Sequence, residues 1–186
     1  MAKSHDNNAT FGMSGRVGQF VYRQWFGKTV VSKTRRPGSQ EPTPDVLTRR
    51  TKFREAILFA KNAIQNAQLK AIYSIYANRG KSALNMAFSD RYHAPVIGEI
   101  DSSAYGGNAG EMINVPVTDN FKVASVQVKI SLPDGTLLEQ GSASVRLDGI
   151  TWEYSSSMAN GSLHGSMISI TAMDHAGNTS VKSKTL

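Results

Sequence analysis

The hydrophobic pattern of the chain changes at Pro95, and this change constrains the fold more than any other feature. Before Pro95, apolar residues recur at intervals of three, four or seven, which places them on one face of a helix. These residues are Val46, Phe53, Ile57, Ala60, Ile64, Ala67 and Ala71. After Pro95, apolar and polar residues alternate in short segments separated by turn signals such as Pro133-Asp134-Gly135, which is typical of β-strands. The sequence therefore predicts an α+β protein in two parts, with the helices in the first part and an all-β second part.

The positive charge of the chain lies almost wholly in the first part. Residues 1–94 contain 16 Lys and Arg against 5 Asp and Glu, residues 95–186 contain 5 against 9, and the net charge of the chain is +7. This asymmetry indicates that the first part meets an anionic partner and that the second part has another role. The chain has no cysteine, which excludes disulfides, thiolate metal sites and cysteine nucleophiles.

The composition and the turn signals predict three domains. Residues 1–14 are polar and include a glycine, and we expect them to form a flexible N-terminal arm. Residues 15–94 are expected to form a basic anchoring domain made of a β-hairpin and helices. Residues 95–186 are expected to form an antiparallel β-sandwich of about seven short strands, with Trp152 in its core.

The hairpin is predicted from two segments rich in β-branched and aromatic residues. These segments are Val17–Gln24 and Lys28–Thr34, and they flank a short Trp25-Phe26-Gly27 turn. An isolated hairpin is only marginally stable in water. We therefore expect it to pack on the helices that follow or on another molecule.

Capping signals place the helices of the anchoring domain. Thr43 is expected to cap a first helix that starts at Pro44, after a proline-rich linker. We expect a break between Asn62 and Asn66, and a second helix that runs to about Asn78. Ser82 is expected to cap a short third helix.

Basic and aromatic side chains cluster in and beside the hairpin and at the start of the first helix. The predicted partner-binding residues are Arg16, Phe20, Tyr22, Arg23, Trp25, Lys28, Lys33, Arg35, Arg36, Arg49 and Arg50. Such a surface could neutralise phosphates while its aromatic rings stack on exposed bases, or it could line an interface with an acidic protein. We favour the protein interface, and no helix–turn–helix or zinc-finger motif supports sequence-specific reading of DNA.

Fragments that imitate catalytic motifs fail on spacing. Gly80-Lys81-Ser82 and Gly27-Lys28-Thr29 end like phosphate-binding loops, but neither has the glycine that such a loop requires five residues earlier. The 4 histidines lack metal-ligand spacing, and Asp174-His175 lies in a turn without a nucleophile as partner. The sequence therefore predicts no catalytic residue, no cofactor and no enzyme activity.

Two acidic residues, Asp119 and Asp174, allow two interpretations. They could flank a calcium site at one end of the sandwich, or they could cap turns. A calcium site needs a cluster of three or more oxygen ligands, which the sequence does not indicate. Turn capping is therefore favoured, and no metal is predicted.

Two stretches of the second part resemble bacterial immunoglobulin-like domains. Residues 171–180, Thr-Ala-Met-Asp-His-Ala-Gly-Asn-Thr-Ser, resemble the closing strand and turn of these domains. Residues 117–128, Val-Thr-Asp-Asn-Phe-Lys-Val-Ala-Ser-Val-Gln-Val, resemble an earlier strand pair. The resemblance implies an immunoglobulin-like sandwich that serves as a binding or spacer module without enzyme activity.

The first part resembles an uncharacterised group of small basic bacterial and phage-type proteins. The matching residues include Gly15-Arg-Val-Gly, Gly27-Lys-Thr-Val-Val, Arg50-Thr-Lys-Phe-Arg and Gly80-Lys-Ser-Ala. The overall architecture resembles accessory proteins of tailed bacteriophage virions, which decorate capsids or tails. This resemblance implies no catalytic residue, and it implies a protein lattice as the partner.

These features predict a non-enzymatic structural component of a large assembly, an auxiliary or capsid decoration protein of a phage virion that is anchored by its basic N-terminal half. We expect its partner to be a lattice of capsid or tail proteins with an acidic surface, which binds many copies in a virion assembled in the host cytoplasm. The alternative is a cytoplasmic, non-specific nucleic-acid-binding protein with an appended immunoglobulin-like interaction domain. No membrane partner is expected, because no apolar run approaches the about 20 residues that span a bilayer and residues 1–8 lack the apolar core of a secretory signal.

Overall fold

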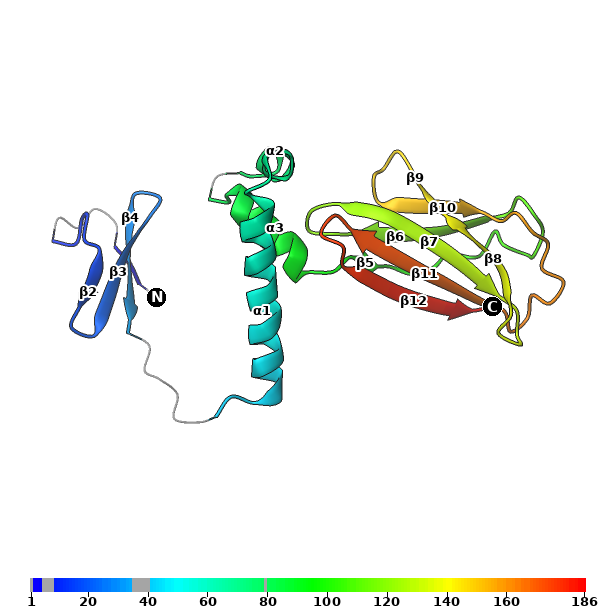
Figure 1. Cartoon of the computed structure of the whole chain (residues 1–186), viewed down its shortest axis with the longest axis horizontal. Helices are drawn as coiled ribbons and strands as arrows, with labels where there is room; N and C mark the ends of the chain where they lie inside the picture. The colour runs from blue at the N-terminus through cyan, green and yellow to red at the C-terminus, as the bar shows by residue number, and fades with distance from the viewer. Residues whose placement is uncertain (1, 5–8, 35–40, 79) are drawn as a thin grey trace. The chain divides into compact units, whose positions relative to one another are not determined.

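The computed structural model describes residues 2–4, 9–34, 41–78 and 80–186. Contacts within the chain divide it into two compact units, Met1–Thr48 and Arg49–Leu186. In the described residues, three helices and three antiparallel sheets form a mixed α+β chain in which strands predominate (Figure 1). The predicted domain boundaries at residues 14 and 94 differ from this division and stay a prediction.

The first unit contains a four-stranded antiparallel sheet in the order β1-β4-β3-β2. Its strands are β1 (Ala2–Ser4), β2 (Gly15–Val17), β3 (Phe20–Trp25) and β4 (Lys28–Lys33). The predicted hairpin is confirmed as the β3–β4 pair, to which β2 adds on one side and β1 on the other. Part of the expected flexible arm is therefore a strand. The sequence does not predict this strand, because so short a segment leaves no periodic pattern.

The turn between β3 and β4 consists of two residues, Phe26 and Gly27, whose φ angles are 50° and 73°. Positive φ at both central residues is the mark of a type I′ turn, whose twist matches that of the flanking strands. Trp25, which the sequence assigns to the turn, instead pairs with Lys28 as the last residue of β3. Glycine adopts positive φ freely, whereas an L-residue such as Phe26 does so at a cost of about 1–2 kcal/mol. The tip of the hairpin thus holds an aromatic residue in a strained conformation.

The three helices begin and end close to their predicted positions. They are α1 (Pro44–Ala63), α2 (Ala67–Ile75) and α3 (Ala83–Tyr92). Asn66 caps α2, since its side chain accepts hydrogen bonds from two main-chain amides of the first turn. Ser82 caps α3 in the same way through Asn85 N. The predicted helix start, the break after α1 and the third cap are confirmed.

The predicted apolar face of the helices is right only in part. Ala60 is buried as expected, but its buried neighbours on α1 are Ala56 and Ala63, and Phe53 is 53% exposed. On α2 the buried residue is Tyr73 rather than the predicted alanines. The reason is that the break between the helices resets the helical phase, so that one stripe cannot continue from α1 into α2.

The second unit also contains two four-stranded antiparallel sheets. One has the strand order β5-β6-β10-β9 and the other the order β12-β11-β7-β8. The strands of the first sheet are β5 (Val96–Ile97), β6 (Met112–Thr118), β9 (Ser144–Val145) and β10 (Thr151–Ser155). Those of the second sheet are β7 (Val123–Ser131), β8 (Leu137–Ser142), β11 (Met167–Asp174) and β12 (Thr179–Thr185).

The two sheets enclose one hydrophobic core and form a β-sandwich (Figure 1). Every second residue of β11 is buried, which places Ile168, Ile170 and Ala172 in this core. Trp152 on β10 belongs to the same core, as predicted. The burial of each large apolar side chain contributes about 1.5–3 kcal/mol, so the sandwich is stabilised mainly by this interior.

We expect Ile170→Ala to lower the free energy of unfolding of the sandwich by about 2–5 kcal/mol, because the truncated side chain leaves a cavity in the core. Val181→Ala on β12 is the matched control, because Val181 is 64% exposed and its truncation should cost no more than about 0.5 kcal/mol. Urea unfolding in a Trp25→Phe background measures both effects, since Trp152 is then the only tryptophan that reports. Equal losses of stability in the two variants would contradict the assignment of the core.

Candidate functional site

The strand pairing of the first sheet distributes the predicted partner-binding residues over its two faces. Arg16 is paired with Val21, and Trp25 with Lys28. Because paired residues and alternate residues along a strand share a face, Arg16, Arg23, Trp25 and Lys28 all lie on one side of the sheet. We call this side the cationic face.

The opposite side of the sheet carries three further predicted residues, Phe20, Tyr22 and Lys33. On this side, Gln24 and Thr29 are tied to the segment that precedes β2. Thr29 Oγ1 donates a hydrogen bond to the Thr10 carbonyl oxygen at 2.9 Å, and Gln24 Nε2 donates to the Met13 carbonyl oxygen at 2.8 Å. The segment around residues 10–13 is thereby attached to the side opposite the cationic face.

The side chains of Arg16, Arg23 and Lys28 on the cationic face are exposed to solvent, and Trp25 is 63% exposed. No Asp or Glu of the described residues lies within ion-pair distance of Arg16, Arg23 or Lys28. Three cations beside an accessible indole ring form a surface that can bind an anionic partner by charge and by stacking. The geometry therefore permits contact with an acidic protein or with a nucleic acid.

The remaining predicted residues are not part of this face. Arg49 and Arg50 are exposed on α1 and belong to the second unit. Arg35 and Arg36 lie outside the described residues. The structure thus brings together Arg16, Arg23, Trp25 and Lys28, and the other predicted contacts stay predictions.

A second candidate site lies in the second unit, where three carboxylates meet. They belong to Asp90 on α3, Asp119 in the turn between β6 and β7, and Asp174 at the end of β11. Each offers one oxygen, and these oxygens lie within 4.8 Å of one another. Asp90 and Asp174 are completely buried, with exposed fractions of 0% and 1%. We call these three residues the aspartate cluster.

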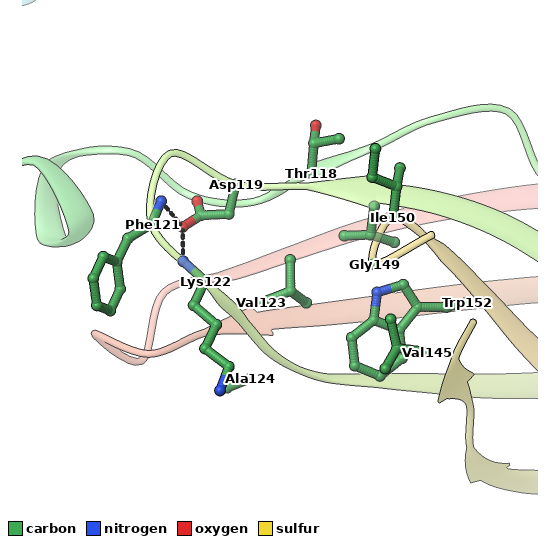
Figure 2. Close-up of a pocket in the computed structure, with 11 residues that line it drawn as sticks. Thr118, Asp119, Phe121, Lys122, Val123, Ala124, Val145, Gly149, Ile150 and Trp152 are labelled. Atoms are coloured by element: carbon green, nitrogen blue, oxygen red, sulfur yellow. Dashed lines mark hydrogen bonds between the residues drawn. The ribbon is translucent and has the colours of Figure 1, made fainter. Parts of the chain in front are cut away.

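Each carboxylate of the cluster accepts hydrogen bonds from uncharged donors. The hydroxyl of Tyr73 donates to Asp90 Oδ2 at 2.6 Å. Asp119 Oδ2 accepts from two main-chain amides of its own turn (Figure 2). Asp174 accepts from the main-chain and side-chain nitrogens of Asn178 at 2.7 and 2.6 Å. The predicted turn capping by Asp119 and Asp174 is therefore confirmed.

Two oxygens of the cluster lack a donor. Asp90 Oδ1 and Asp119 Oδ1 are buried and have no hydrogen-bond partner among the described residues. No Lys, Arg or His of the described part of the chain lies within ion-pair distance of the three carboxylates. Burial, together with the charges of Asp174 and Asp119, raises the pKa of Asp90 to about 7 against the lowering effect of the Tyr73 hydrogen bond. The cluster therefore concentrates negative charge without a neighbouring protein cation.

The sequence does not predict Asp90 as a site residue, although it contains a signal for it. Asp90 follows the buried residues Met86 and Ala87 at helical spacing and so lies on the apolar face of α3. Acidic residues are rarely buried there without a partner. The position of this acid on the apolar face of a helix could therefore have marked Asp90 as a site residue, together with Asp119 and Asp174.

A pocket of about 620 Å³ lies beside the cluster at this end of the sandwich (Figure 2). Its lining is mostly apolar and includes Val145, Ile150 and Trp152, whose Nε1 is buried without a hydrogen-bond partner in the part of the chain that the structure describes. Asp119 belongs both to this lining and to the aspartate cluster. The cluster thus borders the pocket on the side of Asp119.

Within the described ranges, no helix has both the length and the apolar character needed to cross a membrane.

Comparison with known proteins identifies no family for this chain. No family model and no curated protein match it. Among solved structures, it is similar to CopC from Methylosinus trichosporium OB3b, with 14% identity, 49% of this chain and 88% of that chain covered, and a TM-score of 0.36. It is also similar to an engineered protein, with 19% identity, 59% of this chain and 27% of that chain covered, and a TM-score of 0.37. Likenesses this weak carry no argument, so the immunoglobulin-like and phage resemblances gain no support from them and stay predictions.

We expect the stability of the protein, measured without metal ions in a chelating buffer, to fall between about pH 4 and pH 7. An aspartate in the unfolded chain titrates near pH 4, whereas the pKa of folded Asp90 is about 7. Because folding raises this pKa, the folded state binds the proton more tightly, and the stabilisation is lost once the pH exceeds the folded pKa. Asp90→Asn should flatten the pH dependence of Tm over this range. Glu55→Gln, at an exposed position of α1, should leave it unchanged. Coincident profiles of the native chain and Asp90→Asn would contradict the raised pKa.

Proposed function

We propose that this protein is a non-enzymatic structural component of a large assembly, an auxiliary or decoration protein of a phage particle. On this proposal the basic N-terminal unit anchors the chain in an acidic protein lattice. The C-terminal sandwich is an immunoglobulin-like module that serves as a spacer or as an interaction domain. The observation that carries the proposal is the first sheet, which combines a cationic face with the near absence of a core.

The first sheet buries very little of its own apolar surface. Among residues 15–33 only Thr29 and Val30 are buried, whereas Val17, Trp25 and Phe26 are each more than half exposed. A sheet needs a packed hydrophobic face for independent stability. This deficit supports a role in which the sheet is completed by a partner surface.

The chemistry of the cationic face supports an acidic protein as that partner. Arginine and tryptophan are enriched where protein interfaces bury their central contacts. Complementary charge accelerates the encounter and selects the partner. Trp25 and Phe26 stand at the hairpin tip with their ring centroids 5.8 Å apart in an edge-to-face arrangement. The strained φ of Phe26 adds to this argument, because strain in a backbone is commonly retained at functional contacts.

A non-enzymatic role is also supported by the second unit. Its sandwich core is apolar, and its acids cap turns or belong to the aspartate cluster. Asp90 and Asp174 are buried, so a substrate cannot reach their carboxylates without local opening. The unit is therefore better suited to carry or space a surface than to perform catalysis.

We expect the tagged full-length chain to sediment with a heavy particle from its native lysate, and nuclease treatment should leave this association intact. The variant Arg16→Glu/Arg23→Glu/Lys28→Glu should move to the top of the density gradient, because it reverses the charge of the cationic face. The matched control is Lys61→Glu/Lys70→Glu/Lys129→Glu, which changes the net charge equally at exposed positions of the second unit. This control should remain with the particle.

Two outcomes of the sedimentation experiment would contradict the anchoring role. One is a cationic-face variant that stays with the particle as firmly as the control. The other is a native chain that leaves the heavy fraction when nuclease is added, which would identify nucleic acid as the partner.

A second candidate function, non-specific nucleic-acid binding, is favoured by one specific observation. Trp25 is widely exposed among the three cations of one sheet face, an arrangement in which a base can stack while phosphates are neutralised. This alternative makes a quantitative prediction about salt.

If the sheet binds single-stranded nucleic acid, Arg16→Gln/Arg23→Gln/Lys28→Gln should reduce the slope of log K against log salt by about 2, since each lost phosphate contact removes about 0.7. Trp25→Ala should instead weaken binding by about 1–3 kcal/mol without changing the slope. Fluorescence anisotropy with a labelled oligothymidylate measures both quantities. An unchanged slope in the triple variant would exclude the cationic face as the nucleic-acid site.

A further inference from the structure

The aspartate cluster connects three elements of the second unit that are distant in sequence. Asp90 comes from a helix, whereas Asp119 and Asp174 come from the same end of the sandwich. Their nearest oxygens lie within 4.8 Å of one another. Acidic residues in this proximity repel each other unless a cation or protons compensate their charge.

The burial of Asp90 provides an observation that points to a ligand. Its side chain has an exposed fraction of 0%, and Tyr73 occupies only Oδ2. Oδ1 is buried without a hydrogen-bond partner among the described residues and is available to bind an ion. A buried oxygen of this kind is costly to leave unsatisfied. Asp119 Oδ1 is in the same condition, so two of the three carboxylates of the cluster each have one unsatisfied oxygen.

The protein supplies no counter-charge to the cluster within its described residues. Arg91, the nearest basic residue in sequence to Asp90, donates instead to Asn178 Oδ1 at 2.9 Å. The donors that reach the carboxylates are a tyrosine hydroxyl, main-chain amides and the amide of Asn178. All of them are neutral. His175, next to Asp174 in the chain, packs its ring beside those of Tyr73 and Phe121 but forms no ion pair with the carboxylates. The charge of the cluster is therefore left to be balanced by a bound ion or by protons.

We propose that Asp90, Asp119 and Asp174 bind a calcium ion, which fastens α3 to the end of the sandwich. The ligand set consists of carboxylate oxygens, which suits a hard cation rather than zinc. Calcium binds oxygen at about 2.3–2.6 Å, so two oxygens on opposite sides of the ion are about 4.6–5.2 Å apart. The three oxygens lie within 4.8 Å of one another, which is close enough for one such ion to contact all of them. Asp119 also lines the pocket beside the cluster.

Calcium would act on the attachment between the helices and the sandwich. Phe121, in the same turn as Asp119, packs on Tyr73 with ring centroids 4.7 Å apart, and Tyr73 is itself bonded to Asp90. An ion at the cluster would therefore stabilise α2, α3 and the β6–β7 turn together. The proposal is independent of the partner of the cationic face.

The experiment uses the full-length chain, stripped with a chelator and then titrated with CaCl2 by calorimetry. We expect one calcium ion per chain and a Tm that rises with calcium concentration, as for any ligand that binds only the folded state. Asp119→Asn should weaken calcium binding at least about tenfold, because the ligand charge sets the affinity of such sites. The amide oxygen of the new side chain can still accept the turn hydrogen bonds, so this variant should fold.

The matched control is Asp134→Asn, which alters an aspartate that caps the turn between β7 and β8 through Thr136 N. It should bind calcium as the native chain does. Asp90→Asn should also weaken binding, and its Tm in chelator should be at least that of the native chain. If this variant remains folded in chelator, its weaker calcium binding cannot be due to unfolding.

The proposal is overturned if about 10 mM calcium, ten times the weakest dissociation constant typical of calcium modules, produces neither heat nor a change of Tm. It is equally overturned if Asp119→Asn and Asp134→Asn bind calcium alike. A third contrary result would be a Tm that responds to magnesium or zinc but not to calcium. If no metal ion changes the heat signal or the Tm, a proton shared between the carboxylates would be what compensates their negative charge.

Discussion

The attachment of the helices to the sandwich depends on hydrogen bonds around Asn178, and the position of the aspartate cluster depends on that attachment. Asn178 Nδ2 donates to the carbonyl oxygens of Asp90 and His93 at 2.9 and 3.2 Å, and its Oδ1 accepts from Arg91. The last carbonyls of a helix have no partner within the helix, so one side chain of the sandwich satisfies the end of α3. The same side chain bonds to Asp174, which fixes the position of the aspartate cluster.

An apolar contact completes this junction and explains why the helices and the sandwich form one unit. The ring of Phe121 lies 4.7 Å from that of Tyr73 and 4.8 Å from that of Tyr76, measured between centroids. The small helical core therefore includes a side chain of the sandwich. Residues 15–33 of the first sheet have no comparable core, since only Thr29 and Val30 among them are buried. The second unit is thus stabilised by its interior, whereas residues 15–33 of the first sheet bury almost no apolar side chain.

Local signals in the sequence were enough to predict the helices and much of the sandwich. A cap such as Ser82 acts within one helical turn, and the alternation along β11 is visible in consecutive residues, so neither needs knowledge of the fold. Asp90 was not found because its role comes from residues that are close only after folding. Likewise, the grouping of Arg16 with Lys28 on one face depends on a two-residue turn, and a turn one residue longer would have changed the pairing. The sequence therefore predicted elements well and juxtapositions poorly.

The placement of charge gives the two candidate sites different physical requirements. The cations of the cationic face are exposed, where salt screens charge over a Debye length of about 8 Å at physiological ionic strength. A partner there is exchangeable, and its affinity depends on the solution. Asp90 and Asp174 are buried, where screening is weak and an unbalanced charge costs several kcal/mol. The negative charge of such a site has to be compensated by a bound ion or a proton. The stability of the second unit therefore depends on whether that ion or proton is bound. The exposed cations are therefore suited to association with an anionic partner, whereas the buried acids bear on the stability of the second unit.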